Sequence, residues 1–278
     1  MSIYQSNIED LKAGDIALVG IPFDDHSSFL KGPAKAPELI IKALNSDSAN
    51  FYTEQLEDIS AVPNLKWIGN SSLSDYWDIE KTIDQVLAID AIPFSLGGDH
   101  SITYPIIKAI SKKHTSLSIL HFDAHGDLYH ILDNNPFSHA CPFARIMENG
   151  HAQKLTQVGI RTLTQHQKEQ AEKFGVIVNT MKDRHSLKGL GLEGPVYLSF
   201  DMDVFDPAFA PGVSHHEPGG YSSREILDII QSLNLNIIGL DLVEYNPDRD
   251  INGVTAMLAA KIVKELVSIM FKSIVELN

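Results

Sequence analysis

The sequence contains a single cysteine, Cys141, among its 278 residues. One thiol can form neither an intrachain disulfide nor a zinc module built from several cysteines. The first ten residues have no basic segment and no apolar core, so they do not resemble a secretory signal peptide. Long apolar runs are also missing, because the helical pattern of residues 253–277 is interrupted by lysines and glutamates. We therefore expect a cytoplasmic protein with no membrane partner.

Basic residues are scarce relative to acidic ones, with 22 Lys and Arg against 36 Asp and Glu. The formal net charge of −14 and the pI near 5.2 argue against nucleic acids or anionic membranes as partners. The same charge attracts metal cations and cationic substrates. The remaining composition, 44% hydrophobic and 21% charged, is that of an ordinary globular protein.

Short apolar segments alternate along the chain with amphipathic ones. This alternation predicts the α/β class, with three α/β/α layers around a mostly parallel sheet of about eight strands. Strands are expected at residues 16–21, 92–96, 117–122, 157–160, 176–179, 196–200 and 237–241, with a weaker one near Trp67. Helices are expected at residues 38–44, 78–89, about 102–113, 139–149, 165–174, 222–233 and 253–277. Without an internal repeat or a change in composition, residues 1–278 are expected to form a single domain.

The apolar segment 117–122 leads directly into Asp123, His125 and Asp127. Alternate side chains of an extended segment point the same way, so these three can converge on one point. Two carboxylates and an imidazole at a buried strand end are costly unless a cation neutralises them. The segment therefore predicts a metal site.

Three other strands end in the same way, and the carboxyl ends of parallel strands share the edge where ligands bind. The residues that these strands deliver are Asp99 and His100, then Asp201 and Asp203, then Asp241 and Glu244. Asp99 and Asp241 are interpreted as cap or turn residues. Four carboxylates and two imidazoles, without a thiolate, suit two cations that share bridging carboxylates. Such donors favour Mn²⁺, with Zn²⁺, Co²⁺ and Fe²⁺ as alternatives, and a two-metal site of this kind indicates hydrolysis.

At this point the sequence resembles the arginase–agmatinase family, the manganese ureohydrolases. The matching segments are residues 97–101 (GGDHS), 123–127 (DAHGD) and 199–203 (SFDMD), which runs into Asp206-Pro207. It is most similar to plant-type arginases, through residues 26–30 (HSSFL), 32–34 (GPA), 143–148 (FARIME), 207–215 (PAFAPGVSH), 217–220 (EPGG) and 246–250 (NPDRD).

The resemblance implies two Mn²⁺ ions per chain and a role for each matching residue. One ion would be held by His100, Asp123, Asp127 and Asp201, and the other by His125, Asp123, Asp201 and Asp203. The implied catalytic residues are His139 (a proton shuttle), Asp127 and Glu244 (the partner of the substrate guanidinium). For substrate binding we expect Glu244, Asn135, Ser138 and His215. A homotrimer or homohexamer is also implied.

The implied reaction is hydrolysis of L-arginine to L-ornithine and urea. The alternative is an agmatinase, which converts agmatine to putrescine and urea, or a hydrolase of another guanidino compound. Animal-type arginases place an Asn that contacts the α-carboxylate where this chain has Tyr129, so substrate choice depends on residues 128–138. For His130, His215 and His216 two locations remain possible: the mouth of the site or the solvated surface of the protein. Two rivals remain, a silent family member without turnover and a deacetylase-like metal hydrolase.

Overall fold

The computed structural model describes residues 3–277, and its centre is one eight-stranded sheet. The strand order is β2-β1-β3-β8-β7-β4-β5-β6, and all neighbouring strands are parallel. The strands are β1 (Ile16–Gly20), β2 (Leu65–Asn70), β3 (Ile92–Leu96), β4 (Ser118–Phe122), β5 (Lys154–Ile160), β6 (Ile177–Thr180), β7 (Pro195–Asp201) and β8 (Asn236–Val243). The predicted α/β class and parallel sheet are confirmed, and the weak strand near Trp67 is the edge strand β2.

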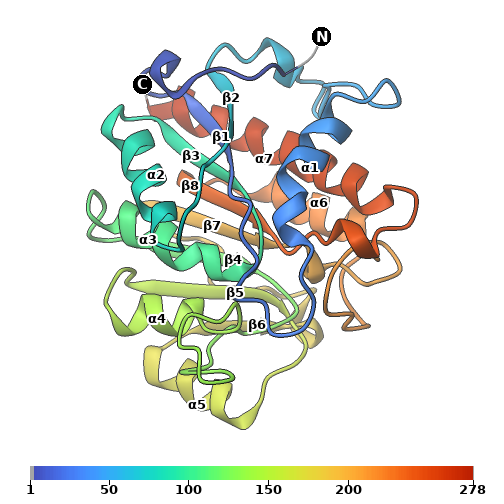
Figure 1. The fold of residues 1–278 in the computed structure, drawn as a ribbon. Coiled ribbons are helices and arrows are strands. Elements are labelled where there is room, and N and C mark those ends of the chain that lie inside the picture. The colour runs from blue at the N-terminus through green and yellow to red at the C-terminus, as the bar shows by residue number, and fades with distance from the viewer. Residues whose placement is uncertain (1–2, 278) are drawn as a thin grey trace.

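Helices cover both faces of the sheet (Figure 1). On one face lie α1 (Ala36–Leu44), α6 (Ser223–Ser232) and α7 (Val254–Leu277). On the other lie α2 (Asp78–Ala88), α3 (Thr103–Ser111), α4 (Pro142–Glu148) and α5 (Gln165–Phe174). The helices of each layer pack an apolar cluster against their face of the sheet, which is why the central strands are buried and mostly apolar. None of the helices within residues 3–277 is both long enough and apolar enough to cross a bilayer.

The strand register brings distant parts of the chain to one level at the carboxyl edge. Phe122 of β4 pairs with Phe200 of β7, and Phe200 pairs with Leu242 of β8. Leu242 pairs in turn with Leu96 of β3. The residues that follow these four positions in the sequence therefore emerge side by side from the sheet.

The expected helix over residues 139–149 differs from α4 at its start. The helix begins at Pro142 rather than at His139. Proline suits the first helical position because it has no N–H to satisfy, and it disfavours helical backbone at the residue before it. His139 therefore lies in the loop that precedes α4, at the edge of the sheet.

Candidate metal centre

The turn after β3 is fixed by a close approach of two chain segments. A Cβ on Gly98 would lie 1.6 Å from the carbonyl oxygen of Phe23, so only glycine permits this contact. The N–H of Asp99 donates to the same oxygen at 2.9 Å. The buried carboxylate of Asp99 accepts from the N–H groups of Ser101 and His26, which agrees with its interpretation as a cap. The next residue in the chain, His100, is thereby held at the edge of the sheet.

One ring nitrogen of His100 is occupied by a relay of hydrogen bonds. Its Nε2 lies 2.9 Å from the Oγ of Ser199, and the Ser199 hydroxyl donates to Asp241 Oδ1 at 2.7 Å. A hydroxyl has a single proton, so Ser199 accepts from His100 Nε2–H. Asp241 also accepts from the hydroxyls of Thr103 and Tyr197. It is therefore a buried acceptor, and the expectation of a turn residue is wrong.

The other nitrogen of His100 faces three carboxylates. Its Nδ1 lies 3.1 Å from Asp123 Oδ2, 3.1 Å from Asp127 Oδ2 and 3.2 Å from Asp201 Oδ2. With the ring proton on Nε2, this buried Nδ1 carries a lone pair. The atom has no hydrogen-bond partner in the described residues. A lone pair surrounded by anionic oxygens is stable only with a cation between them. The residues present therefore fit a metal ion.

A second group adjoins the first through Asp123. The Nδ1 of His125 lies 2.9 Å from Asp203 Oδ2 and 3.4 Å from Asp123 Oδ1. Asp123 thus turns one oxygen toward His100 and the other toward His125. His125, Asp123 and Asp203 are close enough together to coordinate one ion. A carboxylate shared in this way is the arrangement expected of a bridging ligand.

The charges of the cluster are unbalanced without a cation. Burial, together with the negative charges of Asp203 and Asp123, raises the pKa of Asp201 well above its usual value. Burial and Asp123 likewise raise the pKa of Asp203. Burial lowers the pKa of His100, but the surrounding carboxylates outweigh it and raise that pKa well above normal. The cluster takes up positive charge, as protons or as metal ions.

Backbone bends, rather than simple alternation, bring residues 123–127 together. Strand β4 ends at Phe122, and Asp123 Oδ1 then accepts from the N–H of His125 at 2.5 Å. Asp127 has a φ of 47°, in the left-handed region that non-glycine residues seldom adopt. Asp123 and Asp127 consequently meet His100, while His125 turns toward Asp203. The predicted residues do gather, but in two adjoining groups.

A cavity of about 240 Å³ opens above this cluster. We call the six predicted ligands the floor: His100, Asp123, His125, Asp127, Asp201 and Asp203. We call the side chains around the opening the rim: Ser28, Tyr129, Leu132, Gln167 and His215. His139 and Glu244 line the cavity between floor and rim. A larger groove of about 690 Å³ lies between α1 and the start of α7, and none of the predicted site residues lines it.

Of the predicted substrate-binding residues, Glu244 and His215 line the cavity, whereas Asn135 and Ser138 do not. The Asn135 side chain accepts from the N–H of Phe137 at 2.9 Å, within its own loop. Ser138 is buried, with its Oγ 3.5 Å from the N–H of Ala140. Their geometry gives no support to a contact with substrate. Neither His130 nor His216 lines the cavity either, and both are exposed.

Glu244 and His139 form a buried pair beside the floor. Oε1 of Glu244 accepts from the backbone N–H of His100 at 2.9 Å and lies 2.8 Å from Nδ1 of His139. On its other side, His139 Nε2 lies 2.8 Å from the Oγ of Ser28. Burial lowers the pKa of His139, but Glu244 outweighs it and raises the pKa to about 9. Glu244 itself has a left-handed φ of 61°, so backbone strain occurs at this residue as well as at Asp127.

Four side chains that contact the cluster or line the cavity were not expected at the site from the sequence: Ser28, His121, Gln157 and Gln167. His121 contacts Asp123, and Gln157 contacts His121. A signal for His121 exists, because strand alternation places it two residues before Asp123 and on the same face. Ser28 and Gln167 reach the cavity from a loop and from the first turn of α5, and no role at the site was expected for either residue.

Fold and site together define a class: a metal-binding hydrolase with a three-layer α/β fold. The arginase family model matches residues 14–268. The chain is 44% identical over 282 residues to a mitochondrial arginase of Medicago truncatula, covering 94% of this chain and 83% of that protein. It is 41% identical over 278 residues to the chloroplastic/mitochondrial arginase 2 of Arabidopsis thaliana, with 92% and 80% covered. The solved structure of arginase from Medicago truncatula matches with a TM-score of 0.87 and 44% identity, covering 93% of this chain and 88% of that one. The chain belongs to the arginase family.

These relatives correct one expectation. The cytoplasmic location expected from the sequence is contradicted, because plant arginases that are 41–44% identical to this chain are mitochondrial or chloroplastic. The expectation rested on the absence of a secretory pattern. Transit peptides of mitochondria and chloroplasts have a different composition, rich in Arg and Ser and poor in acidic residues. The absence of the first pattern therefore gives no information on the second.

Proposed function

We propose that this protein is an arginase that hydrolyses L-arginine to L-ornithine and urea. The observation that carries the proposal is the floor of four carboxylates and two imidazoles, all buried except His125, beneath a cavity lined by Glu244 and His139. The membership of the chain in the arginase family supports it, as does its similarity to plant arginases. We also propose that residues 1–278 act as a single catalytic domain, since one continuous sheet extends from β1 to β8.

The floor residues would hold two divalent ions, and Mn²⁺ is proposed because oxygen donors predominate. His100, Asp123, Asp127 and Asp201 would hold one ion, and His125, Asp123, Asp201 and Asp203 the other. When bound, two such ions acidify a water molecule so that it acts as a hydroxide at neutral pH. Metal analysis of the purified protein should find close to two divalent ions per chain.

We infer that Glu244 orients the guanidinium. Its Oε1 is already engaged by His100 and His139, so Oε2 is the oxygen that remains for the substrate. A charge-assisted hydrogen bond from the planar cation to a fixed carboxylate positions the guanidinium carbon above the floor. The expected pairing of Glu244 with the guanidinium would therefore use Oε2.

His139 holds the proton that the reaction needs. Hydrolysis adds one water molecule across the bond between the guanidinium carbon and the side-chain nitrogen, and the departing amine must gain a proton. A pKa of about 9 keeps His139 protonated at neutral pH. Its two N–H groups then donate to Glu244 and Ser28, which aims the ring at the cavity.

Agmatinase is the second candidate, and one observation favours it. In the described part of the chain, no lysine or arginine lines the cavity, so an α-carboxylate would meet only neutral donors and histidines. The test compares kcat/KM for L-arginine, agmatine and 4-guanidinobutyrate on Mn²⁺-loaded protein. We expect arginine to be preferred. A tenfold preference for agmatine, about 1.4 kcal/mol of transition-state binding, would replace the arginase proposal by an agmatinase. If the protein released urea from none of the guanidino compounds, the remaining interpretations would be a silent family member or a deacetylase-like hydrolase.

We propose in addition that the 30.7 kDa chain assembles as a homotrimer or homohexamer, as the family resemblance implies. Sedimentation of the purified protein measures the mass directly. A monomeric mass at micromolar concentration would contradict this assembly without affecting the proposed reaction.

A further inference from the structure

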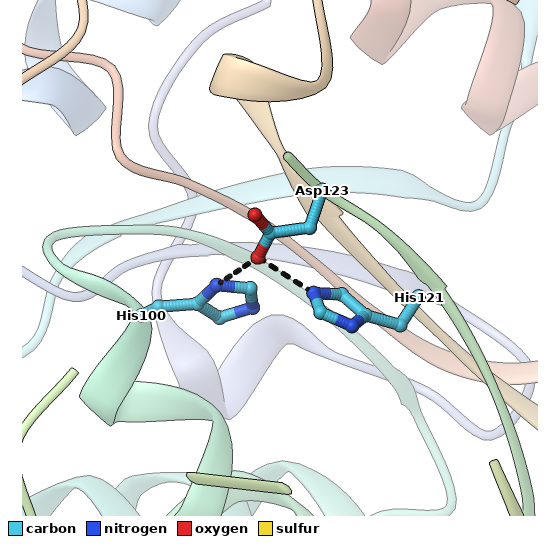
Figure 2. Close-up of side chains that lie close together, drawn as sticks. All are labelled: His100, His121 and Asp123. Atoms are coloured by element: carbon cyan, nitrogen blue, oxygen red, sulfur yellow. Dashed lines mark hydrogen bonds and ion pairs between the residues drawn. The ribbon is translucent and has the colours of Figure 1, made fainter. Parts of the chain in front are cut away.

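A third imidazole contacts the metal cluster, and it is absent from the proposed set of ligands. His121 is fully buried, and its Nε2 lies 2.8 Å from Asp123 Oδ2. The same oxygen lies 3.1 Å from Nδ1 of His100, so two imidazoles flank one carboxylate oxygen (Figure 2). By distance alone, His121 could be a metal ligand, together with His100 and Asp123.

The hydrogen bonds on the far side of the ring decide which nitrogen of His121 carries the proton. Nδ1 lies 3.0 Å from the side-chain nitrogen of Gln157, and that nitrogen also donates to the carbonyl oxygen of Gly126 at 2.7 Å. The Gly126 oxygen can only accept, so it identifies this end of the Gln157 amide as the NH₂ group. The second N–H of that group then donates to Nδ1. In the neutral ring the proton is on Nε2, and Nε2–H donates to Asp123.

Coordination of a metal by His121 would conflict with this arrangement. Nε2 would need a free lone pair, and the proton would move to Nδ1, where it would face the N–H of Gln157. Turning the amide over would place its oxygen against the carbonyl oxygen of Gly126, two acceptors without a proton between them. Each alternative leaves a pair of buried polar groups without a hydrogen bond, which destabilises it relative to the observed arrangement.

The surroundings of His121 also hold its ring in place. His121 and Gln157 are register partners in the parallel pair β4–β5. The ring packs against buried Phe143, with 4.0 Å between centroids, and meets His100 edge to face at 5.0 Å. Because Gln157 and Phe143 hold the His121 ring in place, its Nε2–H donor fixes the direction in which the Asp123 carboxylate points.

We propose that His121 is a positioning residue: it holds Asp123 from outside the metal shell, in the orientation that serves both ions, and Gln157 sets its tautomer. The proposal rests on the proposed metal centre. In metal sites, partners beyond the direct ligands commonly fix the orientation of those ligands, and their loss typically costs 10–100-fold in metal affinity. Here the supported ligand is the one that faces both groups of the floor.

The first test is the substitution His121→Phe, which keeps an aromatic ring against Phe143 and removes the donor. Metal-free protein is titrated with Mn²⁺, and free ion is followed by electron paramagnetic resonance. The variant should still bind two ions, with at least one bound about 10–100-fold more weakly than in the unsubstituted protein. The matched control is His151→Phe, at a half-buried histidine that bonds Ser111 outside the site, and its affinities should be unchanged.

The second test keeps His121 and removes its partner through Gln157→Leu, so it remains informative if His121→Phe fails to fold. Nitrogen-15 spectra of the Zn²⁺-loaded protein should show the His121 proton on Nε2, and the Leu variant should lose this single tautomer. Mn²⁺ affinity in the Leu variant should fall, but by less than in His121→Phe.

Three results would overturn the role of His121. They are unchanged Mn²⁺ affinities in both variants, complete loss of one ion from His121→Phe, or spectra that show Nε2 coordinated to Zn²⁺. The last two would make His121 a ligand. Failure of the unsubstituted protein to bind any divalent ion is a different outcome, because it would overturn the proposed function itself.

Discussion

The floor and the rim of the cavity are built on different principles. The floor residues lie at or just beyond the carboxyl ends of the parallel strands β3, β4 and β7, and all but His125 are buried. The rim residues come from loops and from the first turn of α5, and only Gln167 among them is buried. Strand register fixes the floor, whereas the rim depends on loops that tolerate change. Changes at the floor should decide whether the reaction occurs, and changes at the rim should decide which substrate is used.

The largest effect is expected at the shared floor ligand. Asp123→Asn removes the charge that faces both His100 and His125, so the protein should lose at least one ion. Activity should fall by at least about 10³-fold, the upper range for removal of a single group that stabilises charge at an active site. Metal analysis and urea release measure the two effects. The control is Asp84→Asn, where an exposed pair with Lys112 contributes little. Full metal content in Asp123→Asn would contradict the bridging role.

The next largest effect is expected at His139, which lines the cavity between the floor and the rim. His139→Ala should keep both ions, because His139 contacts Glu244 and Ser28 rather than a floor residue. The turnover number should fall by about 10²–10⁴-fold, the usual contribution of a general acid or base. Metal content and kcat, measured on one preparation, separate a proton carrier from a ligand. Loss of an ion would place His139 in the floor.

A smaller effect concerns pH dependence. The charge of Glu244 is what raises the pKa of His139 to about 9 against the opposing effect of burial. Glu244→Gln removes that charge, so burial should dominate and the pKa should fall below this value. Proton loss from His139 then begins at lower pH, and the alkaline decline in kcat should shift in the same direction. Titration of His139 by nuclear magnetic resonance measures the shift even if turnover is slow. An unchanged titration would show that Glu244 does not set this pKa.

The smallest effect is expected at the rim. Gln167 Oε1 accepts from the N–H of Thr164 in the capping box of α5, and the amide nitrogen has no hydrogen-bond partner among the described residues. Gln167→Glu preserves the capping box and replaces the donor by a negative charge. The preference for arginine over agmatine should fall about tenfold, or about 1.4 kcal/mol. The ratio of the two kcat/KM values measures it, with metal content as the control. An unchanged ratio would show that discrimination lies elsewhere on the rim.

The same division explains what the sequence could predict. The floor was predictable because apolar strands end in ligand-type residues, and parallel strands bring such ends to one edge. The helix boundaries agreed wherever capping residues mark them, as for α5 and α6. Asn135 lies outside the cavity lining, and its position was hard to predict because a short amide side chain readily bonds its own loop. Ser28 was missed because its position depends on contacts such as that between His26 and Asp99, 73 residues apart.

At Asp127, the residue type that the proposed metal centre needs differs from the residue type that would make the protein most stable to heat, because the backbone there is left-handed. Its φ of 47° costs little for glycine and about 1–2 kcal/mol for most other residues, somewhat less for aspartate. Its carboxylate also adds to the crowding of negative charge around His100. An Asp127→Gly protein without metal should therefore melt at a higher temperature than the metal-free parent while losing a ligand. At this position the backbone conformation favours glycine, whereas the proposed metal centre requires a carboxylate.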